Sequence, residues 1–170
     1  MIIWLSGAYG VGKSTLAEAL KDRIENALIF DAEGVGNAVR DSYPDAPYGY
    51  IFEDYPLWSE FCCRLLAYIN ETFPRHFLVP LTLLRPGSYE NIILRLRRAG
   101  IDTRLVILEA ERETIHDRIL ARGEEENCWC MENIDLARAG SHAMEGYHLS
   151  TDRKPIEELA QAVQTLIFPM

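Results

Sequence analysis

The feature that most constrains this chain is a glycine-rich run near its amino end. It reads Gly7-Ala8-Tyr9-Gly10-Val11-Gly12-Lys13-Ser14-Thr15 and matches the pattern G-x-x-x-x-G-K-[ST]. An apolar run at residues 2–5 precedes it, and apolar residues at helical spacing follow it, which predicts a strand, a loop and a helix in that order. Such a loop turns backbone N–H groups toward an anion, and the helix N-terminus adds its positive dipole end. The run therefore predicts a phosphate-binding loop for a nucleoside triphosphate.

Three residues of this loop have separate predicted roles. Lys13 supplies a full positive charge for the β- and γ-phosphates, Ser14 a hydroxyl for Mg²⁺, and Thr15 a donor for the α-phosphate. The alternative is a glycine-rich turn that binds nothing. Because the strand and the helix that the motif requires are both expected, we interpret the whole run as nucleotide-binding.

Composition narrows the class of protein. With 170 residues, of which 48% are hydrophobic, the chain is expected to form a single domain over residues 1–170. The 17 basic and 26 acidic residues give a net charge of −9, which disfavours nucleic acid and anionic membranes as partners. The negative net charge also repels a free nucleotide, so basic residues must gather locally at the nucleotide-binding site.

No signal peptide or membrane-spanning run is evident, and we predict a cytoplasmic protein. The four cysteines, Cys62, Cys63, Cys128 and Cys130, are expected to be free thiols. Cys128 and Cys130 could form one side of a metal site, but no second Cys or His pair has the spacing that zinc needs.

Apolar runs and helical periodicities alternate along the chain and predict an α/β fold of the three-layer P-loop NTPase type, with a five-stranded parallel sheet. After the first strand, we expect strands at 27–31, 76–84, 103–109 and 145–150. Helices are expected at 33–43, 57–72, 88–99, 111–122 and 131–139, and after Pro155. The predicted inner faces are Phe61, Leu65, Leu66 and Ile69 in one helix and Ile156, Leu159, Val163 and Leu166 in the last.

Asp31 closes the second predicted strand, where ligand groups collect in open α/β sheets. Residues 31–34 spell the D-x-x-G of GTPases, but no N-K-x-D follows to read guanine. Two interpretations stay open: Asp31 meets a hydroxyl of an acceptor molecule, or it caps the next helix. The segment at about 32–58 reads as an acceptor-binding insertion, in which Arg40, Asp54 and Trp58 are the candidate acceptor contacts. Its other aromatic residues are interpreted as packing.

The third predicted strand has two unusual features, a proline within it and no acidic residue at its end. Pro80 cannot donate to a ladder and should lie at a bulge or strand end. No acidic residue closes the strand, and Thr82 stands near that place. We therefore expect Mg²⁺ to be held by Ser14, phosphate oxygens and water.

Arg118 and Arg122 are four residues apart on one predicted helix. They either complement the C-terminal end of that helix or clamp phosphate and stack on the base, and we favour the second role. Residues 123–140 follow, with a composition that fits a mobile lid. His116, His142 and His148 show no ligand spacing and are interpreted as ordinary histidines.

The order of these elements resembles the small P-loop kinases, and Asp117-Arg118-Ile119 with Arg122 is similar to the lid entrance of adenylate kinases. Over most of residues 1–140 the chain resembles the ATP-binding tunicamycin-resistance proteins. The matching pieces are Met1-Ile2-Ile3-Trp4, Tyr55-Pro56-Leu57-Trp58, Val79-Pro80 with Thr82, Glu113-Thr114, Asn127-x-Trp129 and Ile134-Asp135. The family often has Arg directly after Ile-Asp, where this chain has Leu136, with Arg138 two positions later.

The resemblance implies a nucleoside- and shikimate-kinase-like fold with a lid, ATP and Mg²⁺ as cofactors, and phosphoryl transfer to a nucleoside antibiotic such as tunicamycin. Lys13, Asp31, Arg118 and Arg122 are then the expected catalytic residues. Two rival functions stay open: a protein that sequesters the antibiotic without phosphorylating it, and a metabolic nucleoside or nucleotide kinase. The sequence is compatible with a monomer or a homodimer.

Overall fold

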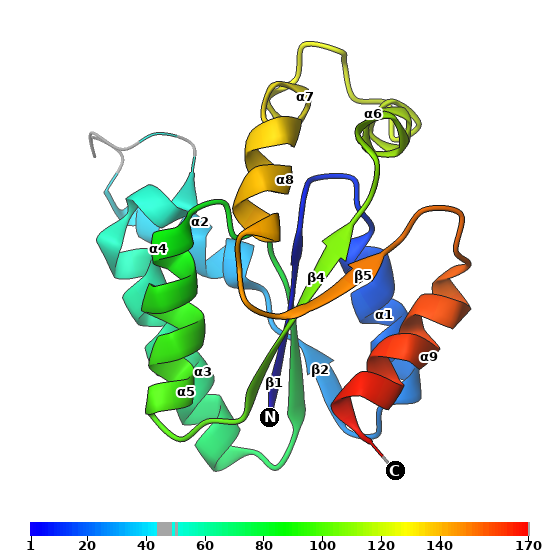
Figure 1. Cartoon of the computed structure of the whole chain (residues 1–170). Helices are drawn as coiled ribbons and strands as arrows, with labels where there is room; N and C mark the ends of the chain where they lie inside the picture. Colours follow the sequence, from blue (N-terminus) through cyan, green and yellow to red (C-terminus); the bar gives the residue numbers. More distant parts are fainter. Residues whose placement is uncertain (44–48, 50, 170) are drawn as a thin grey trace.

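The computed structural model describes residues 1–43, 49 and 51–169. Its centre is one five-stranded sheet with the strand order β2-β3-β1-β4-β5, in which all neighbours are parallel (Figure 1). The strands are β1 (Ile2–Gly7), β2 (Ala27–Ile29), β3 (His76–Pro80), β4 (Thr103–Glu109) and β5 (Tyr147–Ser150). The predicted five-stranded parallel sheet is confirmed.

Helices cover both faces of the sheet and make three layers (Figure 1). On one face lie α1 (Lys13–Arg23) and α9 (Ile156–Ile167). On the other lie α2 (Ala32–Ser42), the short η1 (Phe52–Asp54), α3 (Pro56–Thr72), and a run made of α4 (Pro86–Ser88), η2 (Tyr89–Leu94) and α5 (Arg95–Arg98). Beyond the carboxyl ends of the strands lie α6 (Arg112–Leu120), α7 (Trp129–Glu132) and α8 (Ile134–His142).

The central strand β1 shows how the sequence divides the core. All six of its residues are buried, and alternate side chains enter opposite layers. Ile3 and Leu5 belong to the cluster that includes α1 and α9, whereas Ile2 and Trp4 belong to the cluster that includes α3. The Trp4 indole donates to the carbonyl oxygen of Leu81 at 3.0 Å, so the buried ring leaves no polar group unpaired.

Helix α3 buries only part of the face that its apolar periodicity predicts, since Leu66 is buried and Ile69 packs partly buried against the same cluster. Phe61 and Leu65 are 49% and 41% exposed, whereas the buried residues are Trp58, Cys62, Cys63 and Leu66. The Trp58 indole donates to the Ala32 carbonyl oxygen at 3.0 Å and fixes the rotation of the helix. In the same way, Leu166 of α9 is 38% exposed and Ile167 is buried in its place.

Strand β3 ends at Pro80 rather than at Leu84. Pro80 has no N–H for the ladder, and it is the last residue of β3 in register with β1, opposite Leu5. The freed residues 81–84 leave the sheet and pass beneath the phosphate-binding loop. The predicted position of Pro80 at a strand end is confirmed.

The segment 123–140, predicted as a lid, contributes to the core through its second half. Met131, Ile134 and Ala137 are buried in the same cluster as α1 and α9. A Cβ at Gly140 would lie 2.0 Å from the carbonyl oxygen of Leu84, so α8 and the segment after β3 are in backbone contact. The expectation that this whole segment is unlike a core element is therefore wrong for α8.

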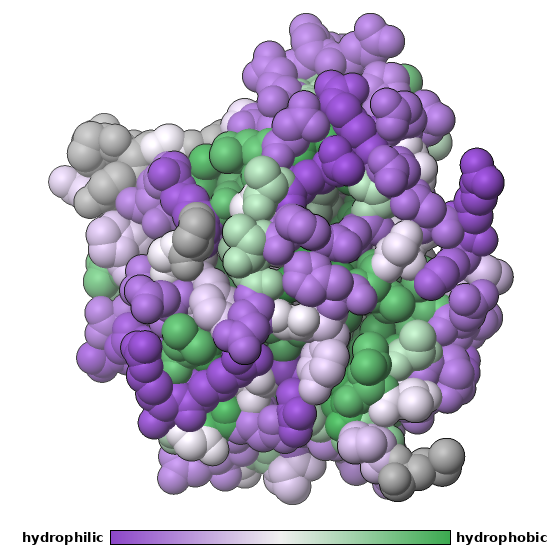
Figure 2. Space-filling view, viewed as in Figure 1, coloured by the Kyte–Doolittle hydropathy of each residue, from purple (hydrophilic) through white to green (hydrophobic). Residues whose placement is uncertain are grey.

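The surface over α6–α8 is mostly hydrophilic (Figure 2). Within the described part of the chain, no helix combines the length and apolar character needed to cross a bilayer. The cytoplasmic location and the oligomeric state stay predictions.

Candidate functional site at the phosphate-binding loop

Three glycines shape the loop between β1 and α1. Gly7, Gly10 and Gly12 have φ angles of 139°, 79° and 104°. A Cβ at Gly7 would lie 2.3 Å from the Leu108 carbonyl oxygen, so the loop can sit directly on β4 only with glycine there. At Gly12, the N-cap of α1, an added Cβ would meet nothing within 4 Å, which leaves the helix N-terminus open toward a ligand.

Lys13 lies over this loop. Its Nζ donates to the carbonyl oxygens of Gly7 and Ala8 at 3.0 and 2.9 Å, and lies 5.6 Å from the centre of the Tyr9 ring. Burial lowers the pKa of Lys13 to about 7; the Glu33 carboxylate opposes this change and the Arg122 guanidinium adds to it. An anion at this position would restore the charge of the ammonium group.

Lys13 faces a cavity of about 540 Å³, here called the P-loop cavity. Its walls come from the loop, α2, residues 51–53, residues 80–84 and the stretch from the end of α6 into α7. The ionisable lining residues are Lys13, Arg40, Arg122, Glu33, Glu53 and Glu124. Basic side chains gather in this cavity, as predicted for an acidic chain that binds phosphate. The carboxylates that line the cavity with them were not predicted.

Glu53 is a buried carboxylate in the wall of this cavity. Its Oε1 accepts a hydrogen bond from the Leu84 backbone N–H at 2.9 Å, while its Oε2 has no partner of good geometry among the described residues. Burial raises the pKa of Glu53, although the Ser88 hydroxyl and the backbone amides of Leu84 and Arg85 act against the rise. A buried carboxylate oxygen beside a cavity is suited to meet a hydroxyl donor of a ligand.

The oxygen donors in the P-loop cavity fit Mg²⁺. Ser14 lines it together with Glu33 and Glu53, and hydroxyl and carboxylate oxygens are the ligands that this ion prefers. Thr82, near the expected place of an acidic residue, donates its hydroxyl to the Gly7 carbonyl oxygen at 2.9 Å. Thr82 therefore supports the loop, and the carboxylate that shares both cavities with Ser14, besides Asp31 in the smaller one, is Glu33 of α2.

Asp31 is the N-cap of α2, and its Oδ1 accepts from the Gly34 backbone N–H at 2.8 Å. Its side chain also lines a smaller cavity of about 160 Å³ together with Ser14 and Glu33. The capping interaction is thus present, and the carboxylate still lies beside the hydroxyl predicted to hold the metal. Its role toward an acceptor stays a prediction.

The three candidate acceptor contacts lie in different environments. Arg40 lines the P-loop cavity, donates to Asn37 Oδ1 at 2.6 Å and lies 5.1 Å from the centre of the Phe52 ring. Trp58 forms part of the wall, but it is only 1% exposed and its indole N–H is used within the core. Asp54 is not among the described lining residues: it is paired with Arg85 at 2.8 Å, and its neighbour Glu53 faces the cavity.

Arg118 and Arg122 contact different parts of the structure, and their roles in clamping phosphate and stacking on the base stay predictions. Arg122 lines the P-loop cavity. Arg118 is held elsewhere: its guanidinium donates to the Thr151 hydroxyl and carbonyl oxygen, both at 2.9 Å, and to the Val11 carbonyl oxygen at 3.3 Å. It therefore ties α6 to the phosphate-binding loop and to the segment after β5.

Glu33, Asn37 and Glu53 line the P-loop cavity and were not predicted from the sequence. Glu33 and Asn37 are four residues apart on α2, on the side that carries Arg40, so helical spacing from Arg40 was a usable signal. No local signal separates Glu53 from Asp54, because the chain there forms a single 3-10 turn.

The structure brings His142 and His148 to one carboxylate oxygen, since both ring Nδ1 atoms lie within 2.9 Å of Glu109 Oε1. Residues distant in sequence meet there through the order of β4, α8 and β5. Residue spacing along the chain does not reveal such a meeting.

No model of a protein family and no curated protein matches the chain. Solved structures share its fold. The tunicamycin resistance protein of Deinococcus radiodurans is 20% identical, with a TM-score of 0.79 over 98% of this chain and 94% of that one. An APS kinase of Mycobacterium tuberculosis, in complex with AMPPNP and APS, is 18% identical, with a TM-score of 0.66 over 98% of this chain and 96% of that one.

A shikimate kinase of Bacteroides thetaiotaomicron is 20% identical, with a TM-score of 0.63 over 98% of each chain. These likenesses cover nearly the whole chain and confirm, at the level of the fold, the resemblance drawn from the sequence. The chain has the fold of the small P-loop kinases, and among solved structures it is similar to a tunicamycin resistance protein.

Proposed function

We propose that this protein is an ATP-dependent phosphotransferase that phosphorylates a hydroxyl group of a small molecule. The observation that carries the proposal is the position of Lys13. Its ammonium group is held over the loop by two backbone carbonyl oxygens, makes no ion pair with the described residues, and faces a cavity large enough for a nucleotide tail and an acceptor. Burial of an unpaired cation is costly, and a polyphosphate offsets that cost.

At the phosphate end of the P-loop cavity, the chain supplies positions and charge rather than covalent chemistry. Lys13 and the loop N–H groups hold the β- and γ-phosphates, and Arg122 stabilises the charge that develops on the transferred group. Ser14 and Glu33, which line the same cavity, would hold Mg²⁺, and the ion would supply positive charge that offsets the charge of the phosphates. Arg118 acts indirectly. Its guanidinium donates a hydrogen bond to the Val11 carbonyl oxygen and thereby stabilises the phosphate-binding loop.

For the acceptor hydroxyl, the suited group is Glu53, whose Oε2 has no partner of good geometry among the described residues. The raised pKa of Glu53 brings this carboxyl closer to the range in which a group can take up a proton at neutral pH. Asp31 is a second candidate for orienting the hydroxyl, from the small cavity beside Ser14. Arg40 and Asn37 add donors on the α2 wall.

For the acceptor itself we propose a nucleoside-like antibiotic such as tunicamycin. The proposal is supported by the aromatic side chains of Tyr9 and Trp129, which line the P-loop cavity beside charged groups. It is also supported by the fold shared with the tunicamycin resistance protein of Deinococcus radiodurans.

One observation favours a rival of another class, a protein that binds ATP and sequesters the antibiotic without phosphorylating it. Thr82 stands where a metal-binding carboxylate is expected, and its hydroxyl is used to support Gly7. A site with a weakly held metal would bind nucleotide yet transfer phosphate poorly.

The experiment incubates the protein with ATP, Mg²⁺ and a panel of nucleosides, tunicamycin among them, and follows products by mass spectrometry. A phosphorylated acceptor supports the proposal, whereas tight one-to-one binding of tunicamycin without a product supports the rival. Lys13→Ala should abolish ATP binding. Lys21→Ala is the matched control, since Lys21 lies on the same helix, is 45% exposed and pairs only with Glu18 among the described residues.

A further inference from the structure

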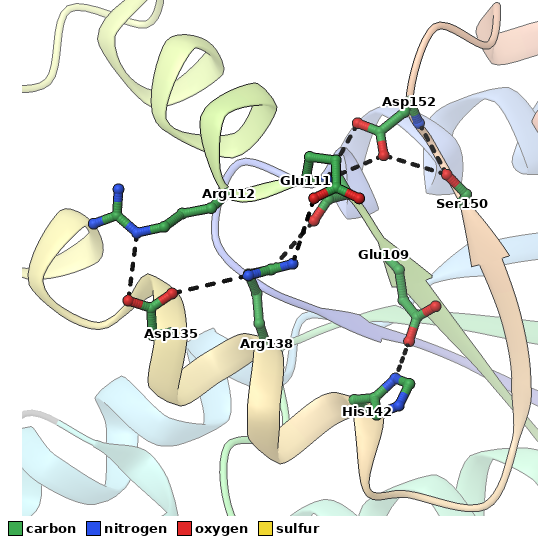
Figure 3. Close-up of polar contacts among 9 residues, drawn as sticks. Glu109, Glu111, Arg112, Asp135, Arg138, His142, Ser150 and Asp152 are labelled. Atoms are coloured by element: carbon green, nitrogen blue, oxygen red, sulfur yellow. Dashed lines mark hydrogen bonds and ion pairs between the residues drawn. The ribbon is translucent and has the colours of Figure 1, made fainter.

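A second polar cluster lies at the carboxyl edge of the sheet, apart from the residues that line the P-loop cavity. Glu109 is the last residue of β4, His142 the last of α8, and His148 lies in β5. The Nδ1 atoms of His142 and His148 lie 2.8 and 2.9 Å from the same atom, Glu109 Oε1. Glu109 and His142 point toward one another from separate elements (Figure 3).

The hydrogen positions at His148 are constrained by its second ring nitrogen. His148 Nε2 lies 3.1 Å from the Met144 carbonyl oxygen, which can only accept, so Nε2 carries a hydrogen. In a neutral imidazole, Nδ1 then presents a lone pair to the Glu109 carboxylate. Two lone pairs at 2.9 Å repel unless a positive charge lies between them. An N–H donated to a backbone carbonyl is also the usual arrangement behind a histidine that binds a metal.

From this geometry we infer that Glu109, His142 and His148 form a binding site for a divalent metal ion of the zinc class. The candidate ligand atoms of the three residues all lie within 4.8 Å of one another. Two imidazoles and one carboxylate suit zinc, whereas Mg²⁺ prefers oxygen ligands. Metal–ligand bonds near 2 Å require the Nδ1–Oε1 separations to widen by about half an ångström. Rotation of the His142 side chain, which is 79% exposed, and of the Glu109 side chain, which is 35% exposed, supplies that change.

The fourth coordination position has room for water or a small ligand. Glu109 and His142 both line a second cavity, of about 520 Å³, next to the cluster. The walls of this cavity include Ser150 and Asp152, which are hydrogen-bonded to each other, and Arg138, which reaches the Ala110 carbonyl oxygen at 3.2 Å (Figure 3). An open position of this kind is characteristic of zinc sites that bind an exchangeable ligand.

The test measures zinc binding to the full chain without nucleotide, by calorimetry and by metal content after dialysis. We expect one zinc ion per chain at this site, with Mg²⁺ in excess unable to displace it. His142→Gln, His148→Gln and Glu109→Gln should each weaken binding at least tenfold, since even groups behind metal ligands contribute about 10- to 100-fold. The matched control His116→Gln, a histidine of α6 outside the cluster, should leave binding unchanged.

Thiols are the main competitor for zinc, because Cys128 and Cys130 are partly exposed and free. A Cys128→Ser, Cys130→Ser variant should therefore keep the site, and bound Co²⁺ should show no thiolate charge-transfer band. The inference is overturned if the wild-type chain binds no zinc, if the cysteine variant loses it, or if His142→Gln and His148→Gln both bind as the wild type does. His142 is exposed, so its variant should fold, which circular dichroism checks.

Discussion

Arg118 and Thr151 are joined twice, since the two terminal nitrogens of the guanidinium donate to the threonine hydroxyl and carbonyl oxygen at 2.9 Å each. One residue of α6 thereby holds the segment after β5, and its third bond, to the Val11 carbonyl oxygen, holds the phosphate-binding loop. A planar cation with several donors can make these contacts together, which a lysine cannot.

We therefore expect Arg118→Lys and Thr151→Val to be coupled. Urea unfolding of the two single variants and the double variant should give a coupling free energy of about 1 kcal/mol, the contribution of a hydrogen bond of this kind. Arg122→Lys paired with Thr151→Val is the control and should be additive, because Arg122 lines the P-loop cavity instead. Equal coupling in both pairs would contradict the structural role assigned to Arg118.

The lowered pKa of Lys13 predicts that ATP binding takes up a proton. With a pKa of about 7, Lys13 is largely neutral at pH 8, and bound phosphates raise its pKa and charge it. At pH 6 the ammonium group is already charged, so no uptake by this residue is expected. Calorimetry at pH 8 in buffers of different ionisation enthalpy should report an uptake of up to about one proton.

The lowered pKa of Lys13 also determines how the contribution of this residue to folding stability changes with pH. Because the folded-state pKa of Lys13 lies below the ordinary lysine value of 10.5, the folded chain binds fewer protons than the unfolded chain between about pH 7 and pH 10.5. Lys13 therefore destabilises the nucleotide-free protein most below pH 7, and this effect fades as the pH rises. Lys13→Met should raise the melting temperature more at pH 6 than at pH 10, and a pH-independent difference would contradict the lowered pKa.

Glu53→Gln should increase stability and reduce phosphoryl transfer. The amide keeps an oxygen for the Leu84 N–H and removes a buried negative charge, so at pH 7.5 the melting temperature should rise by about 2–4 °C for each kcal/mol gained. Acceptor phosphorylation should fall at unchanged ATP affinity, because ATP is held at the other end of the P-loop cavity. Glu124→Gln, on the rim of the cavity, is the comparison and should change neither stability nor transfer by as much.

Asp31→Asn and Asp31→Ala separate the two interpretations of this residue. Both asparagine and aspartate cap helices, whereas alanine removes the hydrogen bond to the Gly34 N–H and should cost about 0.5–2 kcal/mol of unfolding free energy. If Asp31 also orients the acceptor, Asp31→Asn should lose acceptor phosphorylation while keeping wild-type stability. Unchanged phosphorylation in Asp31→Asn would leave Asp31 as a helix cap alone.

Much of the fold could be predicted because its signals are local. The phosphate-binding loop and the order of strands and helices follow from short patterns with a direct steric or hydrogen-bonding cause, and the disturbance of the third strand at Pro80 does so as well, although the predicted strand extends to Leu84. The inner face of α3 could be predicted only in part in this way. Its apolar residues surround the helix, and the bond from Trp58 to the Ala32 carbonyl oxygen decides which of them turn inward.

The residues of the candidate site likewise fall into two groups: those that local sequence patterns predict, and those whose position depends on tertiary contacts. Lys13 and Ser14 follow from the motif, but the choice of Glu53 over Asp54 depends on which side of a single turn faces the cavity. Arg118 and Arg122 share a helix face by spacing, yet Thr151, a residue far along the chain, draws one of them away. The meeting of Glu109, His142 and His148 likewise depends on tertiary arrangement.

The contact between Gly140 and the Leu84 carbonyl oxygen limits which segments can move to close the P-loop cavity. Because the two backbones touch, the C-terminal part of α8 is held against Leu84 in the wall of the P-loop cavity and cannot move away from it as a flap. Any gating movement then belongs to the stretch before α7, where Glu124 is placed at the rim. A bulkier residue at position 140 would separate the two backbones. Helix α8 would then no longer be a fixed surface for the segment before α7 to close against.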